Sequence, residues 1–337
     1  MDECWLNERL TAPSPALIAD MAGIRGDILV LGAGGKMGPT LCLLAKEALA
    51  AAGNPARVIA VSRFSEPGMA EMLSRRGVEV LAADLLDSRG FEVLPLAENV
   101  VYMAGRKFGT HGSESLTWAM NAWLPSRVAE RYRESNIVVF SSGNIYPQTP
   151  VSSGGADEST PPDPVGEYAM SCLARERMFE YAASRFGTPV AVYRLNYACD
   201  LRYGVLCDIA RAVREGAPVP LSMGCFNCIW QGDANEAALR LLRHTSPEVF
   251  RLNVTGPETA SVRGVAEAFG RYFGIQPHFT GEEGPTALLN NAAKMFSLFG
   301  YPSVSLGTML GWQAEWLSSG GRLLNKPTHF EEKKGRY

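Results

Sequence analysis

Three glycines at three-residue spacing, Gly32, Gly35 and Gly38, are the residues of this 337-residue chain whose chemistry is easiest to anticipate. An apolar run at 28–31 leads into them, and apolar residues at helical spacing follow. A strand that turns on glycines into a helix lets the backbone approach a pyrophosphate, which the unpaired N–H groups of the helix N-terminus then bind. The pattern predicts a dinucleotide site, to which further residues of the loop contribute: Gly34, Lys36 and Met37.

The end of the next strand-like run, 57–61, bears on the choice of cofactor. It is followed by Ser62 and Arg63, which are both expected in the cofactor site. Sites that prefer NAD place an acid here to bind the ribose 2′-hydroxyl, whereas an arginine accommodates the 2′-phosphate of NADP. Arg63 therefore favours NADP slightly over NAD, and NAD stays open because an arginine can also stack on adenine.

A regular frame must position these residues, and the first 200 residues show one. Strand-like runs alternate with helical stretches, at 28–31, 57–61, 78–82, 99–103, 136–140 and 189–193. This alternation predicts an α/β fold with a Rossmann-type doubly wound parallel sheet, whose ligand lies at the carboxyl ends of the strands. Residues 147–166, rich in Pro, Gly and Ser, are expected to form an irregular loop.

After residue 200 the alternation gives way to helices expected at 206–215, 262–273, 288–299 and 308–318. They indicate a smaller, interleaved α/β C-terminal substrate domain. We expect an N-terminal extension at 1–25 with a helix on the outside, and a dinucleotide-binding domain at 26–200 with returns at 226–243 and 249–254. The substrate domain would comprise 201–225 and 255–325, followed by a tail at 326–337.

Composition excludes several classes of protein. The net charge is −3 without a large basic cluster, which argues against nucleic acid as a partner. No stretch approaches the ~18 uninterrupted apolar residues of a membrane span, and the N-terminus lacks the features of a signal peptide. We therefore expect a cytoplasmic protein that does not bind a membrane.

Seven cysteines, an odd number scattered through the chain, are expected as reduced thiols. Cys225 and Cys228 form a C-x-x-C pair that could join Cys199 and Cys207 in a four-thiolate zinc site. The spacing of the second pair is wrong for such a site, so small core residues are the favoured interpretation and no metal is predicted.

Further motifs follow the glycine turn along the chain. Asp84-Leu85 follows the third strand-like run, 102–105 (YMAG) ends the fourth, and 140–146 (FSSGNIY) ends the fifth. Asn121 lies between the last two, Tyr168 comes 26 residues after Ser142, and 194–196 (RLN) and 231–233 (QGD) come later. In this order the motifs resemble the extended short-chain dehydrogenase/reductase family, the NAD-dependent epimerase/dehydratase group, over most of the chain.

The resemblance implies a catalytic pair, Ser142 and Tyr168. The tyrosine would exchange a proton with a substrate alcohol or carbonyl while NAD(P) exchanges a hydride, and the serine would hydrogen-bond the same oxygen. The substrate would be a sugar, sugar acid or nucleotide sugar, and the protein a homodimer. Further cofactor contacts are implied for Asp84, Leu85, Met103, Ala104, Gly105, Asn121, Tyr168, Cys172 and Asn196. Substrate contacts are expected from Lys107, the loop 108–111 with His111, and Ser142, Asn144 and Asn196.

One position departs from the family pattern, because Cys172 stands where a lysine four residues after the tyrosine is expected. That lysine would bind the nicotinamide ribose and lower the pKa of the tyrosine. A cation about 4 Å from the phenol is worth roughly 4 kcal/mol at an effective dielectric constant of 20, or about three pKa units. Three replacements remain open: Arg175, which shares the helical face of Tyr168; Arg106 or Lys107; and the positive nicotinamide itself.

The chain is thus predicted to be an NAD(P)-dependent oxidoreductase or epimerase/dehydratase acting by hydride transfer on a hydroxyl or carbonyl of a sugar derivative. The missing lysine leaves one alternative, a catalytically weakened dinucleotide-binding protein that serves as a sensor or scaffold.

Overall fold

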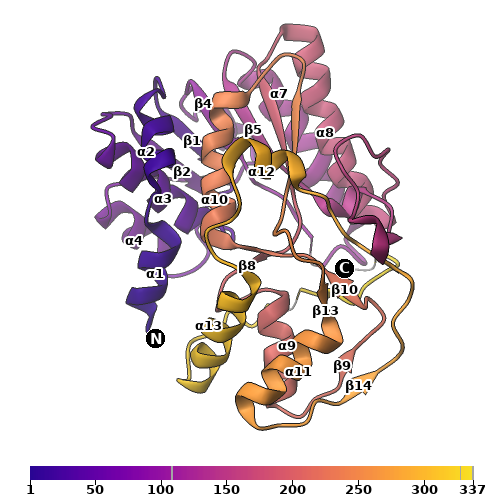
Figure 1. Ribbon diagram of the computed structural model, residues 1–337. Coiled ribbons are helices and arrows are strands. Elements are labelled where there is room, and N and C mark those ends of the chain that lie inside the picture. The colour runs from indigo at the N-terminus through magenta and orange to yellow at the C-terminus, as the bar shows by residue number, and fades with distance from the viewer. Residues whose placement is uncertain (108, 327, 336–337) are drawn as a thin grey trace.

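A seven-stranded parallel sheet forms the frame of the computed structural model, which describes residues 1–107, 109–326 and 328–335 (Figure 1). Its strand order is β12-β7-β5-β4-β1-β2-β3, and every neighbouring pair is parallel. The strands are β1 (Ile28–Leu31), β2 (Val58–Ser62), β3 (Glu79–Ala82), β4 (Asn99–Tyr102), β5 (Asn136–Ser142), β7 (Val190–Leu195) and β12 (Phe250–Val254). The predicted doubly wound α/β fold is confirmed.

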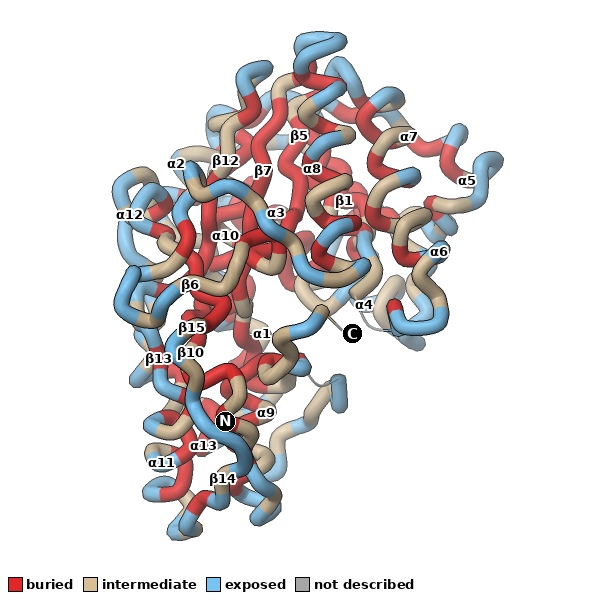
Figure 2. Tube along the Cα trace, turned by 90° about the vertical axis from the view of Figure 1, so that its right-hand side faces the viewer, coloured by how far each residue is buried: buried red, intermediate tan, exposed pale blue. Residues whose placement is uncertain are grey.

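Both faces of the sheet are covered, which explains why the central strands are apolar throughout. Ile28 and Val30 of β1 face one apolar core, whereas Leu29 and Leu31 face another, and all four are fully buried (Figure 2). The first core contains α3 (Gly38–Ala51) and α10 (Gln231–Arg240), and the second contains α7 (Leu124–Arg131) and α8 (Gly166–Phe186). Smaller helices complete the layers: α4 (Met69–Arg75), α5 (Ser88–Glu92), α6 (Glu114–Trp118), the π-helical turn η1 (Ala119–Trp123) and the 3₁₀ turn η4 (Leu241–His244).

The second half of the molecule has its own apolar core below the carboxyl edge of the sheet (Figure 1). Three helices pack around it, α9 (Val205–Arg214), α11 (Val262–Phe273) and α13 (Leu306–Ser318). Its strands occur only in short pairs: β8 (Ala198–Cys199) with β11 (Ile229–Trp230), β9 (Val219–Pro220) with β14 (Phe279–Thr280), and β10 (Cys225–Phe226) with β13 (Ala260–Ser261). In the predicted return at 226–243, α10 lies against α3, whereas β11 pairs outside the main sheet.

The N-terminal extension forms two helices, α1 (Glu3–Thr11) and α2 (Pro15–Ala22), rather than one helix on the outside. The side chains of Leu6 and Leu10 are fully buried in the core of the second half, whereas those of Leu17 and Met21 are fully buried in the sheet core. The extension therefore joins both halves, because its apolar residues serve two different cores.

The helix expected at 288–299 begins late, as α12 (Ala293–Phe299). The preceding residues are extended, because the backbones of Leu289 and Asn291 hydrogen-bond that of Ala156 at 2.8 Å on either side of Asn290. The expected loop at 147–166 is largely irregular, but it contains the 3₁₀ turn η3 (Val151–Ser153) and β6 (Thr149–Pro150), which pairs with β15 (Thr286–Ala287).

No helix in the described part of the chain combines the length and apolar character that crossing a membrane requires. All seven cysteines have free thiols, and Cys199 hydrogen-bonds Cys228. Over the same residues, no group of three or more His, Cys, Asp or Glu side chains could ligate a metal ion.

Candidate active site

A cavity of about 370 Å³ lies where the carboxyl ends of the sheet strands meet the second half. Five segments of the sheet half line it: the loop after β1, the loop after β4, the end of β5, the face of α8 and the chain after β7. The predicted site residues on its wall are Gly32, Gly35, Lys36, Met37, Met103, Gly105, Lys107, Ser142, Asn144, Tyr168 and Asn196. Residues from distant motifs are thus brought together, because parallel strands present all their carboxyl ends at one edge.

The glycine turn has the geometry that its sequence predicts. Gly32 has φ +93°, and a Cβ there would lie 2.5 Å from the backbone nitrogen of Ala104. A Cβ on Gly38 would lie 2.2 Å from the carbonyl oxygen of Ala33, so only glycine lets α3 begin this close to the strand. Gly35 is exposed, and a Cβ there would meet only the Gly32 carbonyl oxygen at 3.5 Å. The loop therefore leaves room for a pyrophosphate above the start of α3.

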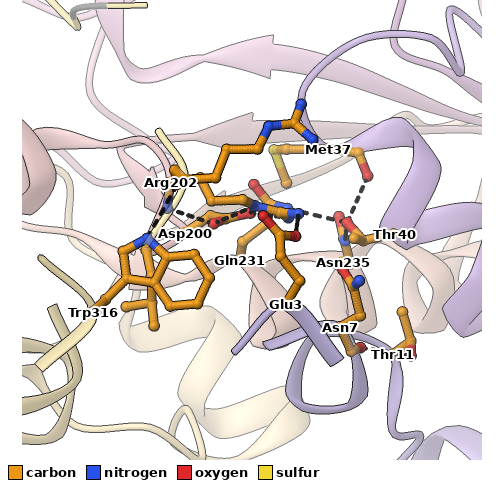
Figure 3. A network of polar contacts seen from close by, with 12 residues as sticks. Glu3, Asn7, Thr11, Met37, Thr40, Asp200, Arg202, Gln231, Asn235 and Trp316 are labelled. Carbon is orange, nitrogen blue, oxygen red and sulfur yellow. Dashed lines mark hydrogen bonds and ion pairs between the residues drawn. The ribbon is translucent and has the colours of Figure 1, made fainter. Parts of the chain in front are cut away.

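Amide side chains of α10 hydrogen-bond the first turn of α3 (Figure 3). Gln231 and Asn235 each donate a hydrogen bond of 3.0 Å to the hydroxyl of Thr40, which itself donates to the carbonyl of Met37. Gln231 belongs to the predicted 231–233 motif, so this motif supports the cofactor loop rather than lining the cavity.

Ser142 and Tyr168 meet at the cavity as the resemblance implied. The hydroxyl of Ser142 donates to the side-chain oxygen of Asn144 at 2.9 Å, and a hydrogen bond with Ser142 lowers the pKa of Tyr168. Burial is the largest influence, and it raises the pKa of Tyr168 well above its ordinary value. With its pKa raised in this way, the phenol would need a nearby cation to act as a base at pH 7.

Cys172 is fully buried beneath Tyr168, in the place of the expected lysine. Burial raises the pKa of its thiol, so the group is neutral at pH 7. A neutral thiol supplies no positive charge, and the other replacements have to be sought nearby.

The three cationic side chains near the cavity, those of Arg175, Lys107 and Arg106, differ in their position and contacts. Arg175 is buried on α8, where its guanidinium donates to the carbonyl of Phe140 and the side-chain oxygen of Asn121, both at 2.7 Å. The ammonium of Lys107 lies 5.5 Å from the centre of the Tyr168 ring. Arg106 also lines the cavity, and its guanidinium donates to the carbonyl of Gly109 in the same loop at 2.8 Å.

Two lysines share the cavity wall, and the charge of Lys107 acts on Lys36. Burial lowers the pKa of Lys107 to about 8 and, together with the charge of Lys107, lowers that of Lys36 to about 7. The ammonium of Lys36 lies 3.4 Å from the centre of the Tyr203 ring. An anionic ligand would raise both pKa values, so the wall is suited to phosphate or carboxylate groups.

Several predicted residues are not among those that line the cavity. Ser62 lies against Gly34, whose Cβ would come 2.5 Å from the serine hydroxyl, and Arg63 is exposed after β2. Asp84 is exposed after β3, whereas Leu85 and Ala104 are buried. His111 is exposed and does not line the cavity, and Phe108 of the same loop lies outside the described residues.

Sequence reasoning expected the second half to form a substrate domain, but it missed two residues from this half that line the cavity, Tyr203 and Thr328. Thr328, from the tail, is anchored to α9 because its backbone N–H and hydroxyl both donate to the carboxylate of Asp208, at 2.7 and 2.6 Å. No local pattern marks either residue. Tyr197 was also missed, although its φ of +45° and its place after Asn196 are signals of a special backbone position.

A model of the NAD-dependent epimerase/dehydratase family matches residues 28–202, which is more than half of the chain. The chain belongs to this family. Membership confirms the resemblance and the prediction of an NAD(P)-dependent enzyme of the epimerase/dehydratase class. The matched range includes the glycine turn, Ser142 and Tyr168 and ends before most of the second half. No curated protein sequence shows a significant match to this chain.

Several solved structures share the fold of this chain. UDP-glucuronic acid 4-epimerase from Bacillus cereus in complex with NAD superposes with a TM-score of 0.68 at 19% identity, and UDP-glucose 4-epimerase from Thermotoga maritima with UDP-glucose gives 0.69 at 18%. MoeE5 in complex with UDP-glucose and NAD gives 0.69 at 20%. Each comparison covers 87% of this chain and 99% of the other.

Proposed function

We propose that the protein is an NAD(P)-dependent epimerase or oxidoreductase that acts on a nucleotide sugar, with Tyr168 as the acid/base. The observation that carries the proposal is the hydrogen-bonded pair of Ser142 and Tyr168 in the same cavity as the glycine turn. A chain without catalytic function has no evident need to bring a phenol and a serine hydroxyl together beside a dinucleotide cradle.

The residues of the cavity suit the cofactor, because the turn at Gly32 to Gly38 leaves room that a Cβ would fill. When bound, the nicotinamide would accept or return a hydride at the substrate carbon. In the oxidative direction Tyr168 would take the proton of the substrate hydroxyl, while Ser142 donates a hydrogen bond to the same oxygen. In the reductive direction the proton would move back from the phenol of Tyr168 to the carbonyl oxygen.

The proposal of a nucleotide sugar rests on two supports. Several solved structures of the same fold are complexes with UDP-glucose or UDP-glucuronic acid. Lys36 and Lys107 line the cavity of this chain, where they would favour an anionic group of the substrate or cofactor. Sugars and sugar acids remain within the proposal as smaller substrates of the same chemistry.

NADP is proposed in slight preference to NAD, because the strand β2 ends in Ser62 and Arg63 with no acidic residue beside them. Solved structures of the same fold contain NAD, so binding of both cofactors has to be compared. Calorimetric titration with NAD+ and NADP+ should show micromolar binding, and Arg63→Ala should weaken NADP+ alone. Equal weakening of both would contradict the role of Arg63.

A homodimer and a cytoplasmic location complete the proposal. The dimer can be checked by light scattering on the purified chain, where the mass of a single chain would refute it.

The deciding experiment compares the wild-type protein with Tyr168→Phe on a panel of UDP-sugars, with sugar interconversion and cofactor reduction as readouts. Loss of the phenol hydroxyl should lower kcat at least about 100-fold. Undiminished turnover would exclude Tyr168 as the acid/base. Cofactor binding without turnover on any sugar would favour the alternative of a dinucleotide sensor, which the neutral Cys172 makes worth testing.

A further inference from the structure

Arg175 reaches the region that the expected lysine would occupy, although it lies seven residues after Tyr168. Side chains of an α-helix point back toward its N-terminus, so a long side chain at this position covers the preceding turn, where Cys172 lies. Arg175 is 5% exposed and lines the cavity together with Tyr168. A Cβ on Gly105 would lie 2.5 Å from the guanidinium, so the glycine after β4 makes room for it.

The guanidinium is held by neutral acceptors that are themselves fixed. The side-chain oxygen of Asn121 accepts from Arg175 at 2.7 Å and from the backbone N–H of Arg106 at 2.9 Å. The amide nitrogen of Asn121 donates to the carbonyl of Arg106 and to the hydroxyl of Ser171, at 2.8 and 3.0 Å. Asn121 lies in the π-helical turn η1, an irregularity that is frequent at functional sites.

No carboxylate within the described residues forms an ion pair with this guanidinium. The next residue, Glu176, is committed elsewhere, because it accepts from Arg194 at 2.8 and 3.1 Å and from Ser141 at 2.5 Å. A buried charge without an ionic partner is costly, and its field is not cancelled locally. The positive charge of Arg175 is therefore available to the groups around it.

We propose that Arg175 supplies the permanent positive charge that favours the phenolate of Tyr168, in place of the lysine that Cys172 replaces. It acts as a positioning residue, through Tyr168, and this inference rests on the acid/base role proposed for that tyrosine.

The electrostatics of the site support this assignment. Burial and the nearby Cys172 raise the pKa of Tyr168, and the Arg175 guanidinium lowers it. The described groups around the phenol include Ser142 at the end of β5, Cys172 and Arg175 on α8, and Lys107 in the loop after β4. Lys107 loses its proton with a pKa of about 8, whereas an arginine keeps its charge at every pH at which the protein is folded. Of these two cations, the guanidinium is therefore the steadier source of positive charge.

The test is the pH dependence of kcat in the oxidative direction for Arg175→Gln, Arg175→Lys and the control Arg177→Gln. Arg177 lies on the same helix, exposed and paired with Glu180, outside the cavity. An opposite charge nearby shifts a pKa by about one to three units. Arg175→Gln should therefore raise the apparent pKa that Tyr168 contributes to the pH profile by about one unit or more. At pH 7 the same variant should lower kcat about 10- to 100-fold. Arg175→Lys should retain most of the rate, and Arg177→Gln should match the wild type.

A second-site variant separates charge from packing. Cys172→Lys should restore kcat in the Arg175→Gln background, and in the wild-type background it should raise kcat less than about threefold, because a cation is already present. A gain above tenfold in the wild-type background would show that the site lacks a cation and would overturn the inference, even if Arg175→Gln proved too unstable to assay.

The inference also fails if Arg175→Gln and Arg177→Gln give the same pH profile of kcat. It fails likewise if the profile is shifted by Lys107→Met and not by Arg175→Gln. If Tyr168→Phe keeps full turnover, the proposed function itself is refuted, which is a different result.

Discussion

The two halves of the molecule are built on different principles. In the sheet half, each strand is one continuous run of sequence that lies beside neighbours of the same kind, as in β1 between β2 and β4. In the second half, the core gathers short pieces from α1, α9, α11, α13 and the tail. The glycine-turn side of the cavity is therefore encoded locally, whereas the side with Tyr203 and Thr328 exists only after distant segments have met.

The largest expected effect is on the local side, in the glycine turn. Gly38→Ala places a Cβ against the carbonyl of Ala33, so we expect the free energy of unfolding to fall by about 3 kcal/mol and dinucleotide binding to be lost. Chemical denaturation and calorimetry with NAD+ measure the two effects.

Gly35→Ala is the matched control in the same turn, because its Cβ would make only an ordinary contact with the Gly32 carbonyl. It should change the free energy of unfolding by less than about 0.5 kcal/mol. If both variants were equally destabilised, the close approach at Gly38 would not be what this turn requires.

A smaller effect is expected from the tail, which belongs to the assembled side. Ending the chain after Asn325 removes Thr328 from the cavity wall together with its two hydrogen bonds to Asp208. We expect KM for the sugar substrate to rise about tenfold, equivalent to about 1.4 kcal/mol, with cofactor affinity unchanged.

Thr328→Val is a smaller change than the truncation. It keeps the hydrogen bond from the backbone N–H to Asp208 and removes the hydrogen bond from the hydroxyl. It should raise KM by less than the truncation does. A truncated protein with lower cofactor affinity and unchanged KM would break the division between the two halves.

The smallest effect expected is a titration at the boundary between the halves. Burial lowers the pKa of Lys107 to about 8, so its charge is present below that pH and lost above it. If the charged form contacts the substrate, kcat/KM should fall about fourfold between about pH 7 and pH 8.5, whereas kcat at saturation should change little.

In the Lys107→Met variant this alkaline fall should be absent. An unchanged fall in the variant would assign the titration to another group, with Lys36 the first to examine because its pKa is lowered to about 7.

The sequence predicted more of the sheet half than of the second half, for physical reasons that particular residues show. The run 28–31 could be recognised as a buried strand because all four of its side chains are apolar. The helix expected at 288–299 was wrong at its start, because the extended pairing at Asn290 depends on Ala156, more than a hundred residues away. Periodicity records local preference, and a long-range hydrogen bond can override it.

The same division applies within the active site. The glycine turn and the order of the serine and tyrosine motifs were readable, since each is a local pattern. The sequence left Arg175, Arg106 or Lys107, and the positive nicotinamide as open replacements for the missing lysine, and neither composition nor spacing separates them.

By itself the sequence determined the family, the parallel sheet and the positions of Gly32, Ser142 and Tyr168, because these depend on residues adjacent in the chain. Only the tertiary structure decided which cation is buried without an acidic partner beside the phenol and which distant residue, Thr328, completes the cavity. The reason is that burial and charge pairing are properties of neighbours in space, which a single chain of letters does not record.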